Sequence, residues 1–125
     1  MKAAKRRWFL YMPAALVAAG IAVFSMMENP QGIIPATTSD KVLHGAAYCV
    51  LALTLLLGLE YKRSACIKHY LYTFLCTIAY GALMEGLQFW FTTTRTAEWG
   101  DLLADGLGAL AAMAIVAIIQ RINHK

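Results

Sequence analysis

The residues of this chain with the clearest potential for chemistry lie inside apolar segments. The stretch YGALMEGLQFWF, residues 80–91, carries Glu85 and Gln88 in a run that is otherwise suited to a membrane span. A carboxylate at such depth costs several kcal/mol unless a partner compensates it. Glu85 therefore indicates either a functional site or a buried polar network, and its partners must come from other segments.

Polar and small residues recur in three segments at intervals of three or four positions. Residues at this spacing share one face of a helix. The three sets are Asp40, His44 and Tyr48; Gly81, Glu85 and Gln88; and Asp101, Asp105 and Gly108. We therefore expect three helix faces that meet around one recess, with Arg95 in the segment that precedes the last set.

Such a recess predicts acid–base chemistry on a lipid-borne anion. Glu85 would accept or donate a proton, and His44, which titrates near neutrality when unperturbed, would be its partner. Asp40 would orient His44 from one turn before, or Asp101 would do so across helices. The planar guanidinium of Arg95 would hold a phosphate. The predicted catalytic set is Glu85, His44 and Asp40, and the predicted substrate-binding set is Arg95, Gln88, Tyr48, Asp101 and Asp105.

The same residues allow two other interpretations. A network of these side chains can hold helices in register without any reaction, because buried polar groups require hydrogen bonds in any case. A zinc or manganese site is a weaker alternative, since one nitrogen and several oxygen donors occur without an HxxxH or HExxH spacing. Its ligands would be His44, Glu85, Asp101 and Asp105. No cofactor is predicted.

The composition indicates a membrane protein. Hydrophobic residues make up 60% of the 125 residues, and charged residues make up 14%, against about 25% in soluble domains. The basic residues stand at the ends of apolar segments and form no continuous face, which argues against binding to nucleic acid. The three cysteines form no CxxC pair, so neither a disulfide framework nor a thiolate zinc site is expected.

Four apolar segments can each cross a bilayer, which needs about 20 residues per helix. They span about 8–27, 42–59, 67–91 and 102–119. The expected fold is all-α, a four-helix transmembrane bundle that forms a single domain over residues 1–125.

The basic residues also predict the orientation of this bundle. On one side lie Lys2, Lys5, Arg6, Arg7, Lys62, Arg63, Lys68, Arg121 and Lys125. The other side carries Lys41 and Arg95. Because Lys and Arg accumulate on the cytoplasmic side, both termini are expected inside (N-in/C-in), with the polar recess near the outer surface.

Three stretches resemble motifs of the VanZ-like membrane family. SDKVLHGAAY resembles the DKxxHxxxY opening of that family, YGALMEGLQFW resembles its GxxxExxQ helix, and TRTAEWGDLLADGLGAL resembles its closing segment with R, D and NxxG. The resemblance covers residues 39–110, and the motifs occur in the family's order. Asp105 stands where the family commonly has asparagine, which adds a possible charge.

The resemblance implies a small multi-pass protein of the bacterial cytoplasmic (inner) membrane. The name-giving members are associated with resistance to the glycopeptide teicoplanin. The expected function is therefore to bind or modify a membrane lipid or a lipid-linked cell-wall precursor at the outward-facing cluster. The alternative is a non-catalytic structural or partner-binding membrane subunit. The oligomeric state stays open.

Overall fold

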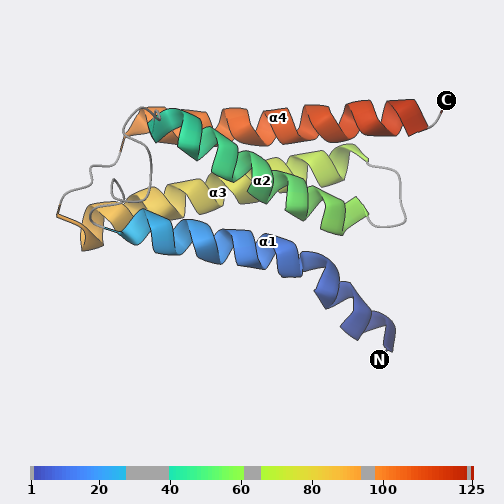
Figure 1. Cartoon of the computed structure of the whole chain (residues 1–125), viewed down its shortest axis with the longest axis horizontal. Coiled ribbons are helices and arrows are strands. Elements are labelled where there is room, and N and C mark those ends of the chain that lie inside the picture. The colour runs from blue at the N-terminus through green and yellow to red at the C-terminus, as the bar shows by residue number, and fades with distance from the viewer. Residues whose placement is uncertain (1, 28–39, 61–65, 94–97, 124) are drawn as a thin grey trace.

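The computed structural model describes residues 2–27, 40–60, 66–93, 98–123 and 125, and these residues form four long helices. The helices are α1 (Lys2–Met26), α2 (Asp40–Glu60), α3 (Ile67–Phe91) and α4 (Trp99–Asn123). Figure 1 shows an antiparallel bundle in which the start of α1 and the end of α4 lie at the same end. The predicted all-α, four-helix fold is confirmed. Which end faces the cytoplasm stays a prediction.

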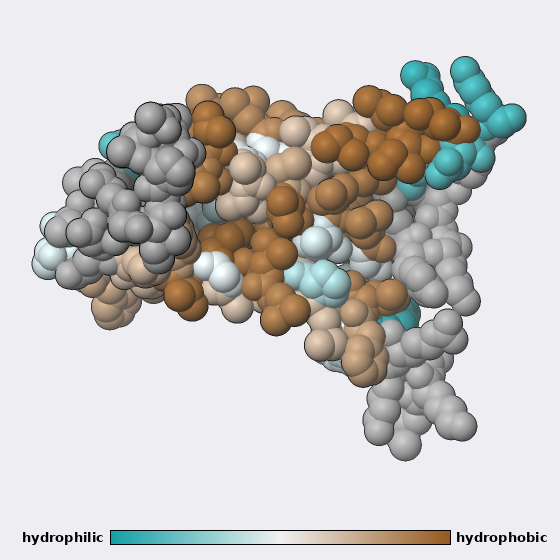
Figure 2. Space-filling model, in the orientation of Figure 1, coloured by the Kyte–Doolittle hydropathy of each residue, from teal (hydrophilic) through white to brown (hydrophobic). Residues whose placement is uncertain are grey.

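All four helices are long and apolar enough to cross a membrane. A helix satisfies its backbone N–H and C=O groups internally, as the hydrocarbon core requires. Large apolar side chains remain exposed along the bundle, among them Leu16 at 69%, Leu57 at 55% and Ile118 at 59%. Figure 2 shows this apolar surface, with hydrophilic residues gathered where α4 ends. The chain is accordingly a multi-pass membrane protein.

The most extensive helix pair is α2 with α4, and its interface is made of small residues. Ala52, Ala109 and Ala112 are fully buried there. A Cβ atom at Gly108 would overlap the backbone carbonyl of Gly45. Small residues let membrane helices approach closely, so that van der Waals contacts hold them together. This close contact sets how the polar ends of α2 and α4 face each other.

A second core joins α1, α2 and α3. It consists of Ile21, Tyr48, Leu51 and Met84. The hydroxyl of Tyr80 donates a 2.5 Å hydrogen bond to the carbonyl of Ala18 and so ties α3 to α1. Tyr48 belongs to this core and also to the predicted set of Asp40, His44 and Tyr48. The core therefore lies beside the polar residues of α2. It therefore fixes the positions of α1 and α3 relative to α2.

Candidate functional site

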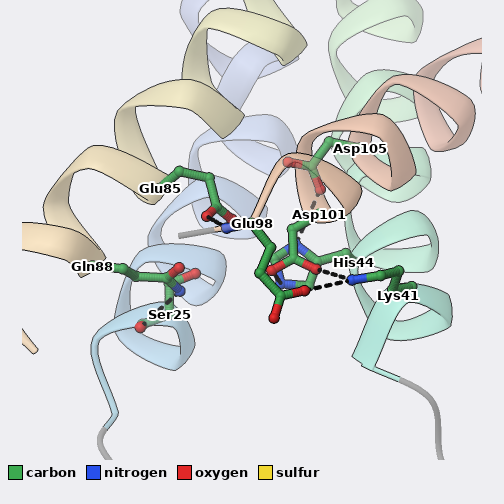
Figure 3. Close-up of polar contacts among 8 residues, drawn as sticks. All are labelled: Ser25, Lys41, His44, Glu85, Gln88, Glu98, Asp101 and Asp105. Carbon is green, nitrogen blue, oxygen red and sulfur yellow. Dashed lines mark hydrogen bonds and ion pairs between the residues drawn. The ribbon is translucent and has the colours of Figure 1, made fainter. Parts of the chain in front are cut away.

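Polar side chains from different helices gather at the end of the bundle opposite the start of α1 and the end of α4 (Figures 1 and 3). His44 of α2, Glu85 of α3 and Asp101 of α4 place one nitrogen or oxygen atom each within 4.8 Å of one another. Asp105 lies one turn further along α4 and also contacts His44. We call Lys41, His44, Glu85, Glu98, Asp101 and Asp105 the polar cluster.

His44 lies between the two aspartates of α4. Its Nδ1 atom is 3.1 Å from Oδ1 of Asp105, and its Nε2 atom is 3.9 Å from Oδ2 of Asp101. When the Asp105 carboxyl group is ionised it can only accept hydrogen bonds, and in that state Nδ1 of His44 is the donor of this contact. The His44 ring also stacks on Tyr48, with ring centroids 6.2 Å apart and an interplanar angle of 2°. These contacts fix the ring in one orientation.

Asp105 is fully buried, although it is an acidic residue. Its Oδ1 atom contacts His44, while Oδ2 has no hydrogen-bond partner among the described residues. A Cβ atom at Gly81 would lie 2.5 Å from Oδ2. The absence of a side chain at Gly81 therefore makes room for the Asp105 carboxyl group. The predicted face of α3 thus contributes space as well as the Glu85 side chain.

Glu85 is held by the backbone that leads into α4. The residue is 9% exposed, and its Oε2 atom accepts a 3.2 Å hydrogen bond from the backbone N–H of Glu98. The carbonyl of Glu98 in turn accepts a hydrogen bond from the N–H of Asp101. The entry to α4 therefore provides a partner for the carboxyl group that stood out in the apolar sequence.

Lys41 is the described cation of the cluster. Its Nζ atom lies 2.9 Å from Oε2 of Glu98 and 3.0 Å from Oδ1 of Asp101. Neither Lys41 nor Glu98 was among the predicted site residues. The spacing could have identified both, because Lys41 precedes His44 by three positions and Glu98 precedes Asp101 by three.

Other predicted site residues lie at the edge of the cluster or outside the described part. The Nε2 group of Gln88 donates a 3.1 Å hydrogen bond to the carbonyl of Ser25, and so joins α3 to α1. Tyr48 is 2% exposed and packs in the second core. Asp40 begins α2, but its side chain lies outside the described residues, as does all of Arg95.

Among the described residues, two cavities flank the polar cluster. The first, of about 380 Å³, is a groove between α1 and α2. Its lining is Val17, Gly20, Ile21, Phe24, Ser25, Leu43, His44, Ala47, Tyr48 and Val50. The second, of about 280 Å³, lies between α3 and α4 and is lined by Ala82, Glu85, Glu98, Trp99 and Leu102. One cavity thus reaches the cluster at His44 and the other at Glu85.

The six described residues of the polar cluster include more acidic than basic side chains. Four carboxyl groups, from Glu85, Glu98, Asp101 and Asp105, face the ammonium of Lys41 and the imidazole of His44. Asp101 and Asp105 are both buried. Charges in such surroundings are screened weakly, so the cluster favours positively charged groups.

Comparison with known proteins found no match among protein-family models, curated proteins or solved structures. The VanZ-like resemblance therefore stays a prediction that rests on the three sequence motifs.

Proposed function

We propose that this protein binds a membrane lipid or a lipid-linked cell-wall precursor at the polar cluster. The observation that carries the proposal is the groove between α1 and α2, whose lining is apolar apart from Ser25, His44 and the Tyr48 hydroxyl. An amphiphile has the matching arrangement, since its chain suits the groove and its head suits the cluster. Binding sites of this kind are mostly apolar with a few polar groups that fix orientation.

Within this proposal, an anionic head group is held by the cations of the site against the negative charge of the described carboxylates, and it meets groups that can move a proton. Lys41 is half exposed and can donate to a phosphate. Arg95, the predicted anion clamp, would act with it. Glu85 and His44 are titratable groups from different helices, which is the arrangement that proton transfer requires. Modification of the bound lipid is therefore part of the proposal.

The proposed cellular setting is the bacterial cytoplasmic membrane, with the cluster near the outer surface. The VanZ-like resemblance supports it, and so does the meeting of residues from all three motifs: His44, Glu85 and Asp101 come from one motif each. On this basis we propose a role in the cell envelope that contributes to tolerance of glycopeptides such as teicoplanin.

Filling the groove tests the binding of a lipid chain. Gly20 lines the groove, and a Cβ atom there meets nothing within 4 Å, so Gly20→Leu adds bulk without a backbone clash. Gly86 of α3 has equally open surroundings and does not line the groove, which makes Gly86→Leu the matched control. Native mass spectrometry with added phosphatidylglycerol or undecaprenyl phosphate would measure the lipid-bound fraction. The fraction should fall severalfold in Gly20→Leu alone, and equal binding in both variants would contradict the proposal.

A second experiment separates chemistry from a purely structural role. Glu85→Gln keeps the size of the side chain and removes its charge, and Lys68→Gln, an exposed charge-to-amide change near the start of α3, is the control. We expect Glu85→Gln to abolish teicoplanin tolerance in cells that contain normal amounts of the protein. If Glu85→Gln and His44→Asn only reduce the amount of folded protein, the cluster holds helices together and the non-catalytic alternative is correct.

A further inference from the structure

We infer that His44, Glu85 and Asp101 bind one divalent metal ion, Zn²⁺ or Mn²⁺. The three residues come from three helices, and one donor atom of each lies within 4.8 Å of the others. One imidazole nitrogen with two carboxylate oxygens is a donor set that both ions accept. Zn–N and Zn–O bonds of about 2.0–2.2 Å would bring the donor atoms to roughly 3.4 Å apart, which small side-chain rotations achieve.

Each of these ligands is held in place by a neighbouring residue through one of its polar atoms. His44 is held through Nδ1 by Asp105, Asp101 through Oδ1 by Lys41, and Glu85 through Oε2 by the N–H of Glu98. A metal ion would then take Nε2 of His44, Oδ2 of Asp101 and Oε1 of Glu85. Preorganised donors of this kind lose little freedom when the ion binds.

The contact between His44 and Asp105 is typical of metal-binding histidines. Such histidines donate their second ring N–H to a carboxylate or carbonyl, which fixes the tautomer and makes the ligating nitrogen more basic. With the proton on Nδ1, the ligating atom of His44 is Nε2, which lies 3.9 Å from Oδ2 of Asp101. Asp105 is thus a positioning residue for the proposed ion.

The buried charge points to the same ligand. Asp105 is fully buried, and its Oδ2 atom has no partner among the described residues. Asp101 and Glu85 are buried as well. Buried ionised carboxylates are costly unless they are paired or coordinate a metal. An ion bound beside His44 would offset the charges of Asp101 and Glu85, whereas Oδ2 of Asp105 faces Gly81 and is not one of its ligands.

Three protein ligands leave coordination positions for water or for a phosphate oxygen. The cavity next to Glu85 and the groove that reaches His44 both give access to such a position. An ion would also let an acidic cluster accept an anionic head group. This role in holding a phosphate rests on the proposed function, whereas binding of the ion itself does not.

Metal titration tests the inference directly. The full chain, purified in detergent and stripped with EDTA, is titrated with ZnCl₂ or MnCl₂ by calorimetry, and bound metal is counted after gel filtration. We expect one ion per chain, a loss of at least 100-fold in affinity for His44→Gln, Glu85→Gln and Asp101→Asn, and a loss of 10–100-fold for Asp105→Asn. Lys68→Gln is the control: it is an exposed charge-to-amide change near the start of α3, at the other end of that helix from Glu85, and should bind as the wild type does.

Fewer than about 0.1 ion per chain with both metals would overturn the inference, as would unchanged affinity in all three ligand variants. X-ray absorption of the Co²⁺-loaded wild type gives a second test, which does not depend on the folding of any variant. One histidine nitrogen among oxygen ligands supports the site, and a shell of oxygen alone overturns it. Lipid binding by metal-free wild type would remove the phosphate role and leave the proposed function intact.

Discussion

Gly81→Ala tests how closely the Asp105 carboxyl group is packed between α3 and His44. The new Cβ atom would lie 2.5 Å from Oδ2 of Asp105 and 3.4 Å from a ring carbon of Tyr48. Carbon and oxygen atoms pack comfortably at about 3.5 Å, so the Asp105 carboxyl group must move by about 1 Å. In the wild type, Oδ1 of Asp105 lies 3.1 Å from Nδ1 of His44. A shift of that size would break the hydrogen bond.

The size of the effect follows from two opposing contributions. A hydrogen bond to a charged group contributes about 1.5–3 kcal/mol. Alanine in the middle of a helix is favoured over glycine by about 0.5–1 kcal/mol. We therefore expect Gly81→Ala to lower the free energy of unfolding by about 1–2 kcal/mol. A Cβ atom at Gly86 meets nothing within 4 Å, so Gly86→Ala should instead raise the free energy of unfolding by about 0.5–1 kcal/mol.

Both variants are unfolded reversibly in the same detergent micelles, with the fraction folded followed by circular dichroism. Comparing them cancels the helix preference, and the remaining difference should be about 1.5–3 kcal/mol. Binding of Zn²⁺ should also weaken in Gly81→Ala alone, because His44 loses its positioning contact. The reasoning fails if Gly81→Ala is as stable as Gly86→Ala and binds the ion equally well.

Three further predictions concern helix packing and charge. Gly108→Ala should destabilise the bundle by about 1–3 kcal/mol, because its Cβ would overlap the backbone of α2. Gly45→Ala is the control and should be tolerated, because its Cβ would lie 3.6 Å from the carbonyl oxygen of Ala104, an ordinary contact distance. Equal thermal unfolding temperatures of the two variants would refute the predicted difference. Tyr80→Phe removes the donor to the Ala18 carbonyl and should lower the free energy of unfolding by about 0.5–1.5 kcal/mol; no change would show that the bond contributes nothing. Lys41→Gln removes the ammonium that lies 3.0 Å from a carboxylate ligand. The loss of this competing positive charge should outweigh the loss of the contact that holds Asp101, so Zn²⁺ binding should tighten in calorimetry. Weaker binding would mean that this ammonium supports the ion site.

The four-helix fold was predictable because a membrane leaves few alternatives. Each apolar segment is long enough to span the bilayer, and a spanning segment must satisfy its own backbone groups. The start of α1 was harder to predict. The helix begins at Lys2, upstream of the apolar segment that starts at residue 8. Hydropathy predicts which residues cross the membrane and contains no signal for where the helix itself begins.

The residues of the site were more predictable than their pairing. Helical spacing was enough to select His44, Glu85 and Asp101. It did not reveal which carboxylate holds His44, and Asp40 and Asp101 were the residues considered. Asp105 makes the 3.1 Å contact, because the partner depends on the axial offset between α2 and α4. Spacing within one helix contains no information on that offset.

The axial offset between α2 and α4 depends on glycine residues, which have no reactive side chain. Gly108 lets the backbones of α2 and α4 touch at Gly45, one position along α2 from His44. Gly81 leaves the space that the Asp105 carboxyl group fills. The same small residues thus hold the helices together and bring the ionisable groups into contact. A loss of activity in a glycine variant therefore cannot separate a structural role from a functional one, whereas a carboxylate-to-amide change of equal size can.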